Sequence, residues 1–437
     1  MGEQREVTSD ARDYATAMLQ FIDESPSPFH AVAAAEQRLS ALGYQLLDEG
    51  APWSLEAEGR YLIKRGGSLI ALQLGSEAPA EAGFRLVGAH TDSPNLRLKP
   101  GLAKAAHGQL LFDIEPYGGL LIATWSDRDL AVAGRVLIRG AEGLEERLVR
   151  SDAICRVANL AIHLNRGVND EGLRLNKHKH LAPLLGAWDG ERAPEEIARS
   201  WLAELSGCAP EEIVGHDLSL FDVQPGAFTG LRGEYLQTGR LDNLASSYHG
   251  LSALLEVSEE PAPFTRVLCL FDHEEVGSRS ARGADGDLLA SILRRVAGEG
   301  VEALPRAIER SWQVSADMAH ALHPNYADRH AKEHAPEMNK GPVIKHNVNT
   351  RYATDGETSA RFRMICDALS VPVQDFVNRP DLACGSTIGS ITAAQLGLRT
   401  VDVGNPMWSM HSAREMAGTE DQILMHQVLA GFYRGLA

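Results

Sequence analysis

The fold is decided by the stretch VLCLFDHEEVG, residues 267–277. Its first five residues, Val267 to Phe271, form a continuous apolar run, which is typical of a strand covered on both faces. Apolar residues at helical spacing predict a helix before it, at about 242–254, and another after it, at about 287–297. Strands that alternate with helices indicate an α/β domain with a largely parallel sheet.

The same alternation extends outward in both directions. On the N-terminal side, a buried strand is expected at Phe84 to Val87, and Gly66-Gly67 predicts the turn of a hairpin. Further strands are expected at 313–315, 343–345, 373–377 and 400–403, and further helices at about 10–24, 29–42 and 421–433.

The pattern changes between about Leu96 and Gly233. Short β-like runs, such as Leu120 to Trp125 and Gly134 to Ile138, are separated by glycine-rich turns. Helical spacing returns near Pro194 to Leu205. We therefore expect an inserted β-rich domain at 96–233, within a catalytic domain formed by residues 1–95 and 234–437.

Composition excludes several kinds of partner. The 437 residues carry a net charge of -17, which disfavours nucleic acid and anionic membrane surfaces. The five cysteines are widely spaced and form no C-x-x-C pair, as expected in a reducing compartment. The first residues are polar, and no apolar run approaches the roughly 20 residues of a membrane span. We expect a soluble cytoplasmic protein.

Five short polar segments draw attention, and four of them follow an apolar strand-like run. They are HTD at 90–92, LDN at 241–243, DHEEVG at 272–277, SAD at 315–317 and MHS at 410–412. In open α/β sheets, ligands bind beyond the carboxyl ends of the strands. Taken singly, His90 is more often a structural histidine, and Asp242 and Asp317 are more often helix caps.

The adjacent pair Glu274-Glu275 is harder to explain structurally. Two carboxylates directly after an apolar strand repel each other and suffer desolvation, so a cation should compensate them. The alternative is a solvated loop.

Together, the two histidines and three carboxylates of these segments can hold two divalent ions. One carboxylate must bridge, because ions in such sites lie roughly 3.5–4 Å apart. A bridging hydroxide then neutralises the site and serves as the nucleophile. A further carboxylate must take the proton of the water and pass it to the leaving amine. Ligands of this kind accept Zn, Co or Mn.

As a set, these segments resemble the aspartyl aminopeptidase family of two-zinc exopeptidases, and the resemblance covers nearly the whole chain. Its further motifs are SPFH at 27–30, HPNY at 323–326, KGPVIK at 340–345, CGSTIG at 384–389 and MHSARE at 410–415. The resemblance implies that His90 and Asp317 bind one zinc ion and that Glu275 and His411 bind the other. It implies that Asp242 bridges the two ions. It also implies that Glu274 is the general base and acid, and that Asp92 orients the His90 imidazole.

The resemblance also implies how substrates and partners are selected. Lys345 would pair with an acidic first side chain, although a lone strand-end lysine is usually solvated. The pocket would be lined by Gly385, Ser386 and Thr387, which by themselves suit a helix N-terminus. His163 would reach a neighbouring subunit's site or bind metal in its own chain, whereas alone it is more often a core residue. The insert would mediate dimers that assemble into a closed dodecamer.

The expected function is therefore removal of N-terminal Asp or Glu from peptides. The first alternative is a two-metal aminopeptidase or deacylase of neutral specificity, because the same ligands serve all of these enzymes. The second is a non-catalytic oligomeric scaffold. The segment NPMWS at 405–409 stands where relatives usually carry smaller or aliphatic residues, and its Trp408 could reshape the side-chain pocket.

Overall fold

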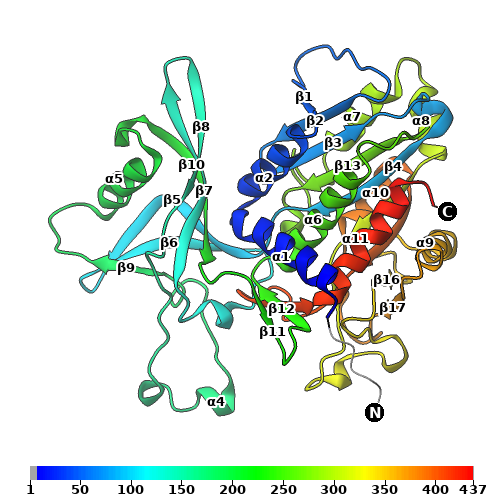
Figure 1. The fold of residues 1–437 in the computed structure, drawn as a ribbon. Coiled ribbons are helices and arrows are strands. Elements are labelled where there is room, and N and C mark those ends of the chain that lie inside the picture. Colours follow the sequence, from blue (N-terminus) through cyan, green and yellow to red (C-terminus); the bar gives the residue numbers. More distant parts are fainter. Residues whose placement is uncertain (1–6, 437) are drawn as a thin grey trace. The chain divides into compact units, whose positions relative to one another are not determined.

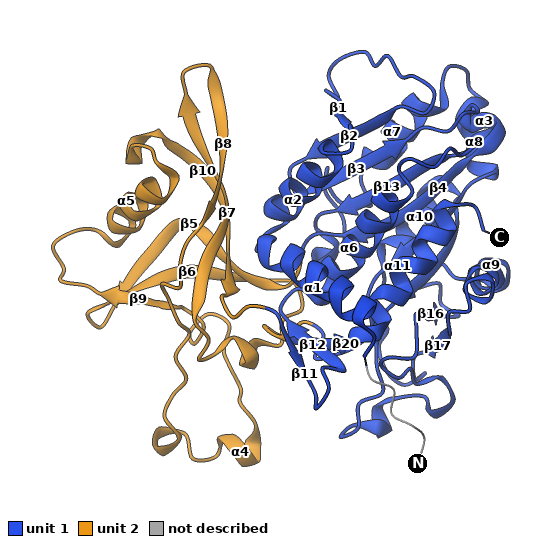
Figure 2. Cartoon of the chain, viewed as in Figure 1, with its two compact units in different colours: residues 1–92, 226–410, 415–437 blue, residues 93–225, 411–414 orange. Residues whose placement is uncertain are grey.

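The computed structural model describes residues 7–436. The chain forms two compact units, shown in different colours in Figure 2. Unit 1 comprises residues 1–92, 226–410 and 415–437, and unit 2 comprises residues 93–225 and 411–414.

The core of unit 1 is a nine-stranded sheet in the order β1-β2-β3-β13-β4-β14-β18-β16-β17. Its strands are β1 (Gln45–Leu46), β2 (Arg60–Arg65), β3 (Ser68–Gln73), β4 (Phe84–His90), β13 (Thr265–Phe271), β14 (Trp312–Ala316), β16 (Val343–His346), β17 (Gln374–Val377) and β18 (Arg399–Gly404). The four central strands β13, β4, β14 and β18 run parallel, and every residue of β13 is buried. The strand expected at 267–271 is present as β13, and the hairpin expected at Gly66-Gly67 joins β2 to β3.

Helices cover both faces of this sheet, as the continuous apolar strands require (Figure 1). One face packs against α1 (Ser9–Glu24), α2 (Pro28–Ser40), α6 (Leu241–Glu256), α9 (Gly356–Ala368) and α11 (Thr419–Tyr433). The other face packs against α7 (Leu288–Ala297), α8 (Ala303–Glu309) and α10 (Ile388–Leu396). Along β13, Leu268 and Leu270 point to the first face while Val267 and Cys269 point to the second. The predicted α/β sandwich is confirmed.

A smaller five-stranded sheet also belongs to unit 1. Its order is β11-β12-β20-β19-β15, with β11 (Ala227–Thr229), β12 (Tyr235–Thr238), β15 (Ala319–His320), β19 (Pro406–Trp408) and β20 (Glu415–Gly418). Because β11 pairs with β12, the chain joins unit 1 at Gly226, before the expected boundary at Gly233.

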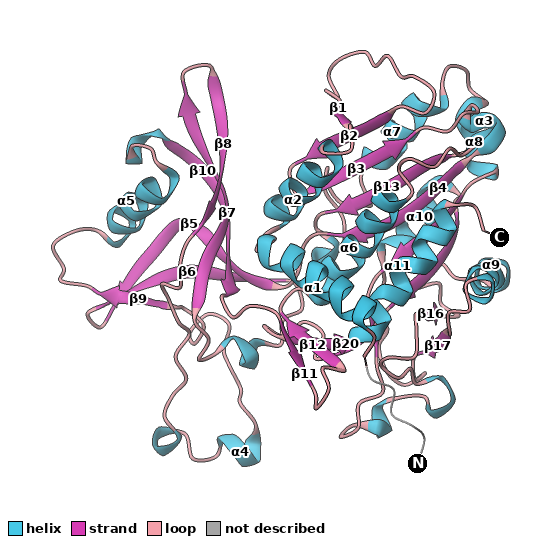
Figure 3. Ribbon diagram, viewed as in Figure 1, coloured by secondary structure: helices cyan, strands magenta, loops and turns pink. Residues whose placement is uncertain are grey.

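Unit 2 is built on a six-stranded antiparallel sheet in the order β8-β7-β10-β5-β6-β9 (Figure 3). Its strands are β5 (Asn95–Ala106), β6 (Gln109–Tyr117), β7 (Leu130–Gly140), β8 (Gly143–Arg150), β9 (Leu184–Ala187) and β10 (Ile213–Asp222). Helix α5 (Pro194–Ser206) contributes Ala198, Leu202 and Ala203 to the core of unit 2. The predicted β run at 120–125 is wrong, because Ile122–Trp125 form the 3-10 turn η1 and bury Trp125.

Within residues 7–436, no helix combines the length and the apolar character that a bilayer span needs.

Candidate functional site

The candidate residues of unit 1 gather at the carboxyl ends of neighbouring parallel strands. His90 is the last residue of β4, Glu274 and Glu275 lie in the turn after β13, and Asp317 directly follows β14. Asp242 lies at the start of α6, which packs on these strands. Strand order therefore brings together residues that are up to 227 positions apart, the separation of His90 from Asp317.

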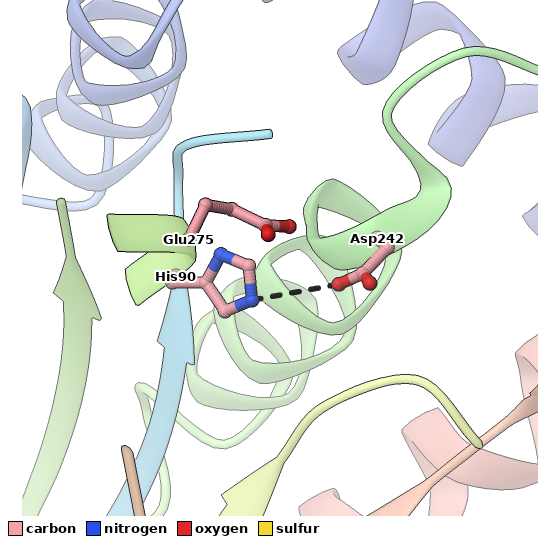
Figure 4. A group of neighbouring side chains, drawn as sticks. All are labelled: His90, Asp242 and Glu275. Carbon is pink, nitrogen blue, oxygen red and sulfur yellow. Dashed lines mark ion pairs between the residues drawn. The ribbon is translucent and has the colours of Figure 1, made fainter. Parts of the chain in front are cut away.

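His90 lies at the centre of this acidic cluster. Its Nε2 is 3.4 Å from Asp242 Oδ1, 3.5 Å from Asp317 Oδ1 and 3.9 Å from Glu274 Oε2. Figure 4 shows His90, Asp242 and Glu275 converging, and each offers a ligand atom within 4.8 Å of the others. The His90 Nδ1 lies 3.0 Å from the Asp92 carbonyl oxygen, which can only accept, so Nδ1 carries a proton and Nε2 is the ring nitrogen that faces the acidic cluster.

The charges of the cluster are unbalanced. The pKa of Glu274 is raised to about 8, mainly by burial. His90 lowers this pKa, whereas the neighbouring Asp317 and Asp92 raise it. Burial, followed by Asp242, holds the pKa of Glu275 well above its ordinary value. Divalent cations would relieve both the desolvation and the repulsion, and imidazole with carboxylate oxygens is a donor set that zinc accepts. The residues present therefore fit metal ions.

Asp92 contacts both glutamates of the site in addition to the His90 imidazole. Its side chain is fully buried, and Oδ1 lies 3.4 Å from His90 Nδ1. Oδ1 also accepts a hydrogen bond from the Glu274 amide, and Oδ2 accepts one from the Glu275 amide, both at 3.1 Å. One carboxylate thus ties the histidine to the backbone of both glutamates.

Lys345, on β16, is buried with 2% of its side chain exposed. Its Nζ donates to the Met318 carbonyl at 3.1 Å and lies 3.4 Å from Asp317 Oδ2. The Tyr352 ring lies 5.2 Å from Nζ. The lysine is therefore next to an expected metal ligand, and Tyr352 is a neighbour that carried no signal in the sequence.

The Gly385 to Thr387 segment leads into α10, with Thr387 at the cap position. Gly385 and Ser386 are exposed, whereas Thr387 is buried and donates from Oγ1 to Asp402 Oδ1 at 2.6 Å. Asp402 Oδ2 accepts from the Ala353 amide, also at 2.6 Å. This buried acid joins two loops, and an acid inside the apolar run of β18 was the signal that could have revealed it.

Two expected residues belong to unit 2. His411 Nδ1 lies 3.1 Å from the Gly119 carbonyl, so this nitrogen donates. His163 lies in an exposed 3-10 turn, η2 (Ile162–Leu164). The group of His90, Asp242 and Glu275 belongs to unit 1, whereas both of these histidines belong to unit 2.

Trp408, on β19, packs in the smaller sheet of unit 1. Its ring lies 5.8 Å from the Tyr235 ring and 5.6 Å from the His323 ring. Its Nε1 donates to the Leu322 carbonyl at 3.0 Å.

A family profile and curated relatives match nearly the whole chain. The profile of the family described as aminopeptidase I zinc metalloprotease (M18) matches residues 21–433. A probable M18 family aminopeptidase 2 of Pseudomonas paraeruginosa is 49% identical over 424 residues, which cover 95% of this chain and 97% of that protein.

Solved structures resemble the whole chain. The cryo-EM structure of the Ape4 and Nbr1 complex contains a chain with a TM-score of 0.95 and 35% identity, covering 99% of this chain and 88% of that one. The S. cerevesiae mApe1 dodecamer matches with a TM-score of 0.86 and 29% identity, covering 97% of each chain. An M18 aminopeptidase from Thermotoga maritima, at 20% identity and a TM-score of 0.86, covers 99% of each chain and shares the fold.

Proposed function

The chain belongs to the M18 family of zinc aminopeptidases, and on that premise we propose that it removes N-terminal Asp or Glu from peptides with two divalent ions. Zinc is the expected metal, and Co or Mn would also suit these ligands. His90 and Asp317 would hold one ion, Glu275 and His411 would hold the other, and Asp242 would be shared by both. When bound, the ions polarise the scissile carbonyl and lower the pKa of a water molecule.

Glu274 is the proton carrier in this proposal. Its carboxyl group lies 3.9 Å from His90 and is mostly buried, with 15% of the side chain exposed. Glu274 is not among the expected metal ligands, so its carboxylate oxygens can accept and donate a proton. Glu274 can therefore take the proton of the attacking water and donate it to the leaving amine.

The buried ammonium of Lys345 is the observation that supports a preference for substrates with an acidic first residue. Three N–H bonds are available on Nζ, and one of them donates to Met318. Asp317 lies near a second, but its carboxylate would be shared with a metal ion. Nζ therefore has the capacity to pair with a substrate carboxylate, and Gly385, Ser386 and Thr387 would line the same pocket.

Specificity is tested with Asp-, Glu- and Leu-terminal reporters after chelation and addition of Zn, Co or Mn. We expect acidic reporters to be cleaved about 100-fold faster than the Leu reporter, the scale of one buried ion pair. Faster cleavage of the Leu reporter would favour a neutral aminopeptidase. Turnover of acylated amines alone would favour a deacylase, and inactivity with every metal would favour a scaffold.

Replacing Lys345 by methionine keeps the length of the side chain and removes its charge. We expect kcat/KM for Asp reporters to fall about 100-fold, with little change for Leu reporters. His346→Met is the control, because successive strand residues point to opposite faces. Equal losses on both reporters would show that Lys345 does not select the acidic side chain.

We also propose that unit 2 mediates dimers that build a dodecamer, with His163 reaching the neighbouring site. Leu160, Ile162 and Leu164, around His163, are 60%, 47% and 74% exposed, which is unusual for three large apolar residues so close in sequence. A second copy of the chain would cover them. The five cysteines, all within the described residues, are free thiols, which supports a cytoplasmic location.

A further inference from the structure

The turn that carries both glutamates has an uncommon backbone conformation. The 3-10 turn η4 (Glu274–Val276) lies between His273, at a φ of 66°, and Gly277, at a φ of 92°. Glycine adopts this left-handed region freely, whereas histidine persists there only when its surroundings hold it. The contacts of the His273 side chain therefore help to determine where Glu274 points.

Two side chains hold the His273 ring. Its Nδ1 lies 2.7 Å from Ser280 Oγ, and its Nε2 lies 3.2 Å from Arg282 Nη2. A guanidinium group donates hydrogen bonds and cannot accept them, so Nε2 is the acceptor. The ring proton is then on Nδ1, which donates to Ser280. Arg282 thus sets both the tautomer and the orientation of the ring.

Arg282 is itself held beside the start of the same turn. Its Nε lies 3.6 Å from Oδ2 of the buried Asp272. The Arg282 carbonyl accepts from Ser68 Oγ at 2.8 Å, and the same Oγ accepts from the Asp272 amide at 2.8 Å. Asp272 Oδ1 in turn accepts from the His273 amide at 2.9 Å. The two ends of the segment from Asp272 to Arg282 are therefore linked by these contacts, and both ends contact His273.

The β2–β3 hairpin leaves space for these side chains. A Cβ on Gly66 would lie 2.6 Å from Cδ and Nη1 of Arg282. A Cβ on Gly67 would lie 2.4 Å from Asp272 Oδ2. Both distances are too short for real atoms, so side chains at these two positions would displace Arg282 or Asp272.

We propose that Arg282 is a positioning residue for Glu274 and acts through His273. Asp92 also holds this turn, because its carboxylate accepts hydrogen bonds from the Glu274 and Glu275 amides. The turn is thus held by two sets of contacts, and the direction of the Glu274 carboxylate depends on both. This inference rests on the proposed function, because it assumes that Glu274 carries the proton.

The first test is Arg282→Ala. We expect kcat on the best reporter to fall about 10- to 100-fold, as a small misplacement of a catalytic group does, with KM and zinc content unchanged. Added guanidinium should restore part of kcat, and the same concentration of sodium chloride should not. The matched control is Arg279→Ala, because Arg279 lies in the same loop with 88% of its side chain exposed. The control should keep its kcat.

A double-mutant cycle tests the route through His273. His273→Ala should lower kcat by a similar factor, and Arg282→Ala should add little in that background, since residues that act as a unit are not additive. Independent additive losses would overturn the inference. If Arg282→Ala does not fold, Arg282→Lys keeps the charge beside Asp272 but lacks the planar fork. Full wild-type kcat in Arg282→Lys would overturn the inference.

Hydrogen exchange separates this inference from the proposed function, because it needs no activity. In the metal-free protein, the Glu274, Glu275 and Gly277 amides should exchange faster in Arg282→Ala than in Arg279→Ala. Equal exchange in these two variants and wild type would overturn the inference, whatever the activity. A wild-type enzyme that cleaves none of the reporters would instead overturn the proposed function.

Discussion

Replacing Glu274 by glutamine is expected to lower kcat by about 10³-fold while leaving bound zinc unchanged. The amide keeps the size of the side chain at its place 3.9 Å from His90, but it cannot accept the proton of a water molecule. Metal content stays the same because the five expected ligands do not include Glu274. Steady-state turnover of an Asp reporter and zinc per subunit are the two measurements.

Glu142→Gln is the control for this change, because Glu142 is exposed in the turn between β7 and β8. It should match wild type in both measurements. If Glu274→Gln kept more than about a tenth of wild-type kcat, the role of Glu274 in proton transfer would be wrong. Loss of zinc from this variant would instead make Glu274 a metal ligand.

Replacing Asp242 by asparagine is expected to remove zinc as well as activity. Asp242 is buried, and its Oδ1 lies 3.4 Å from His90 Nε2, in the middle of the acidic cluster. A bridge contributes negative charge to both ions, so its neutralisation weakens both sites at once. We expect kcat to fall about 10³-fold, the scale of losing a strong electrostatic stabiliser. Zinc per subunit, measured after dialysis, should fall in parallel.

Asp367→Asn, at an exposed position just before the end of α9, is the matched control and should retain zinc and activity. Excess zinc should restore part of the activity of Asp242→Asn, since the other ligands remain. Full zinc occupancy in Asp242→Asn after dialysis would contradict a bridging role. Loss of only half of the zinc would indicate that Asp242 serves a single ion.

Local pattern was enough to predict the sheet and most of the cluster. A strand-like run that leads into a polar segment identified β4 with His90, β13 with Glu274 and Glu275, and the strand before Asp317. Because parallel strands end at one edge, that local information also predicted that these residues would meet. The same approach failed at 120–125, where an apolar run forms the turn η1 and not a strand.

Contacts between distant segments were beyond the reach of the sequence. The Tyr352 ring beside Lys345 and the buried Asp402 between two loops depend on how loops with no periodicity fold back on the sheet. The early return to unit 1 at Gly226 depends on β11 pairing with β12. None of these partners has a spacing or composition that singles it out.

By itself, the sequence determined the α/β class, the strand ends and the kinds of side chain that meet there. Those features follow from burial and periodicity, which are properties of short segments. Only the tertiary structure decided that the Asp92 carboxylate binds both glutamate amides, and that Arg282 reaches His273 across the turn. Hydrogen bonds of this kind depend on side-chain direction and backbone angle at each residue, which come from packing and not from spacing along the chain.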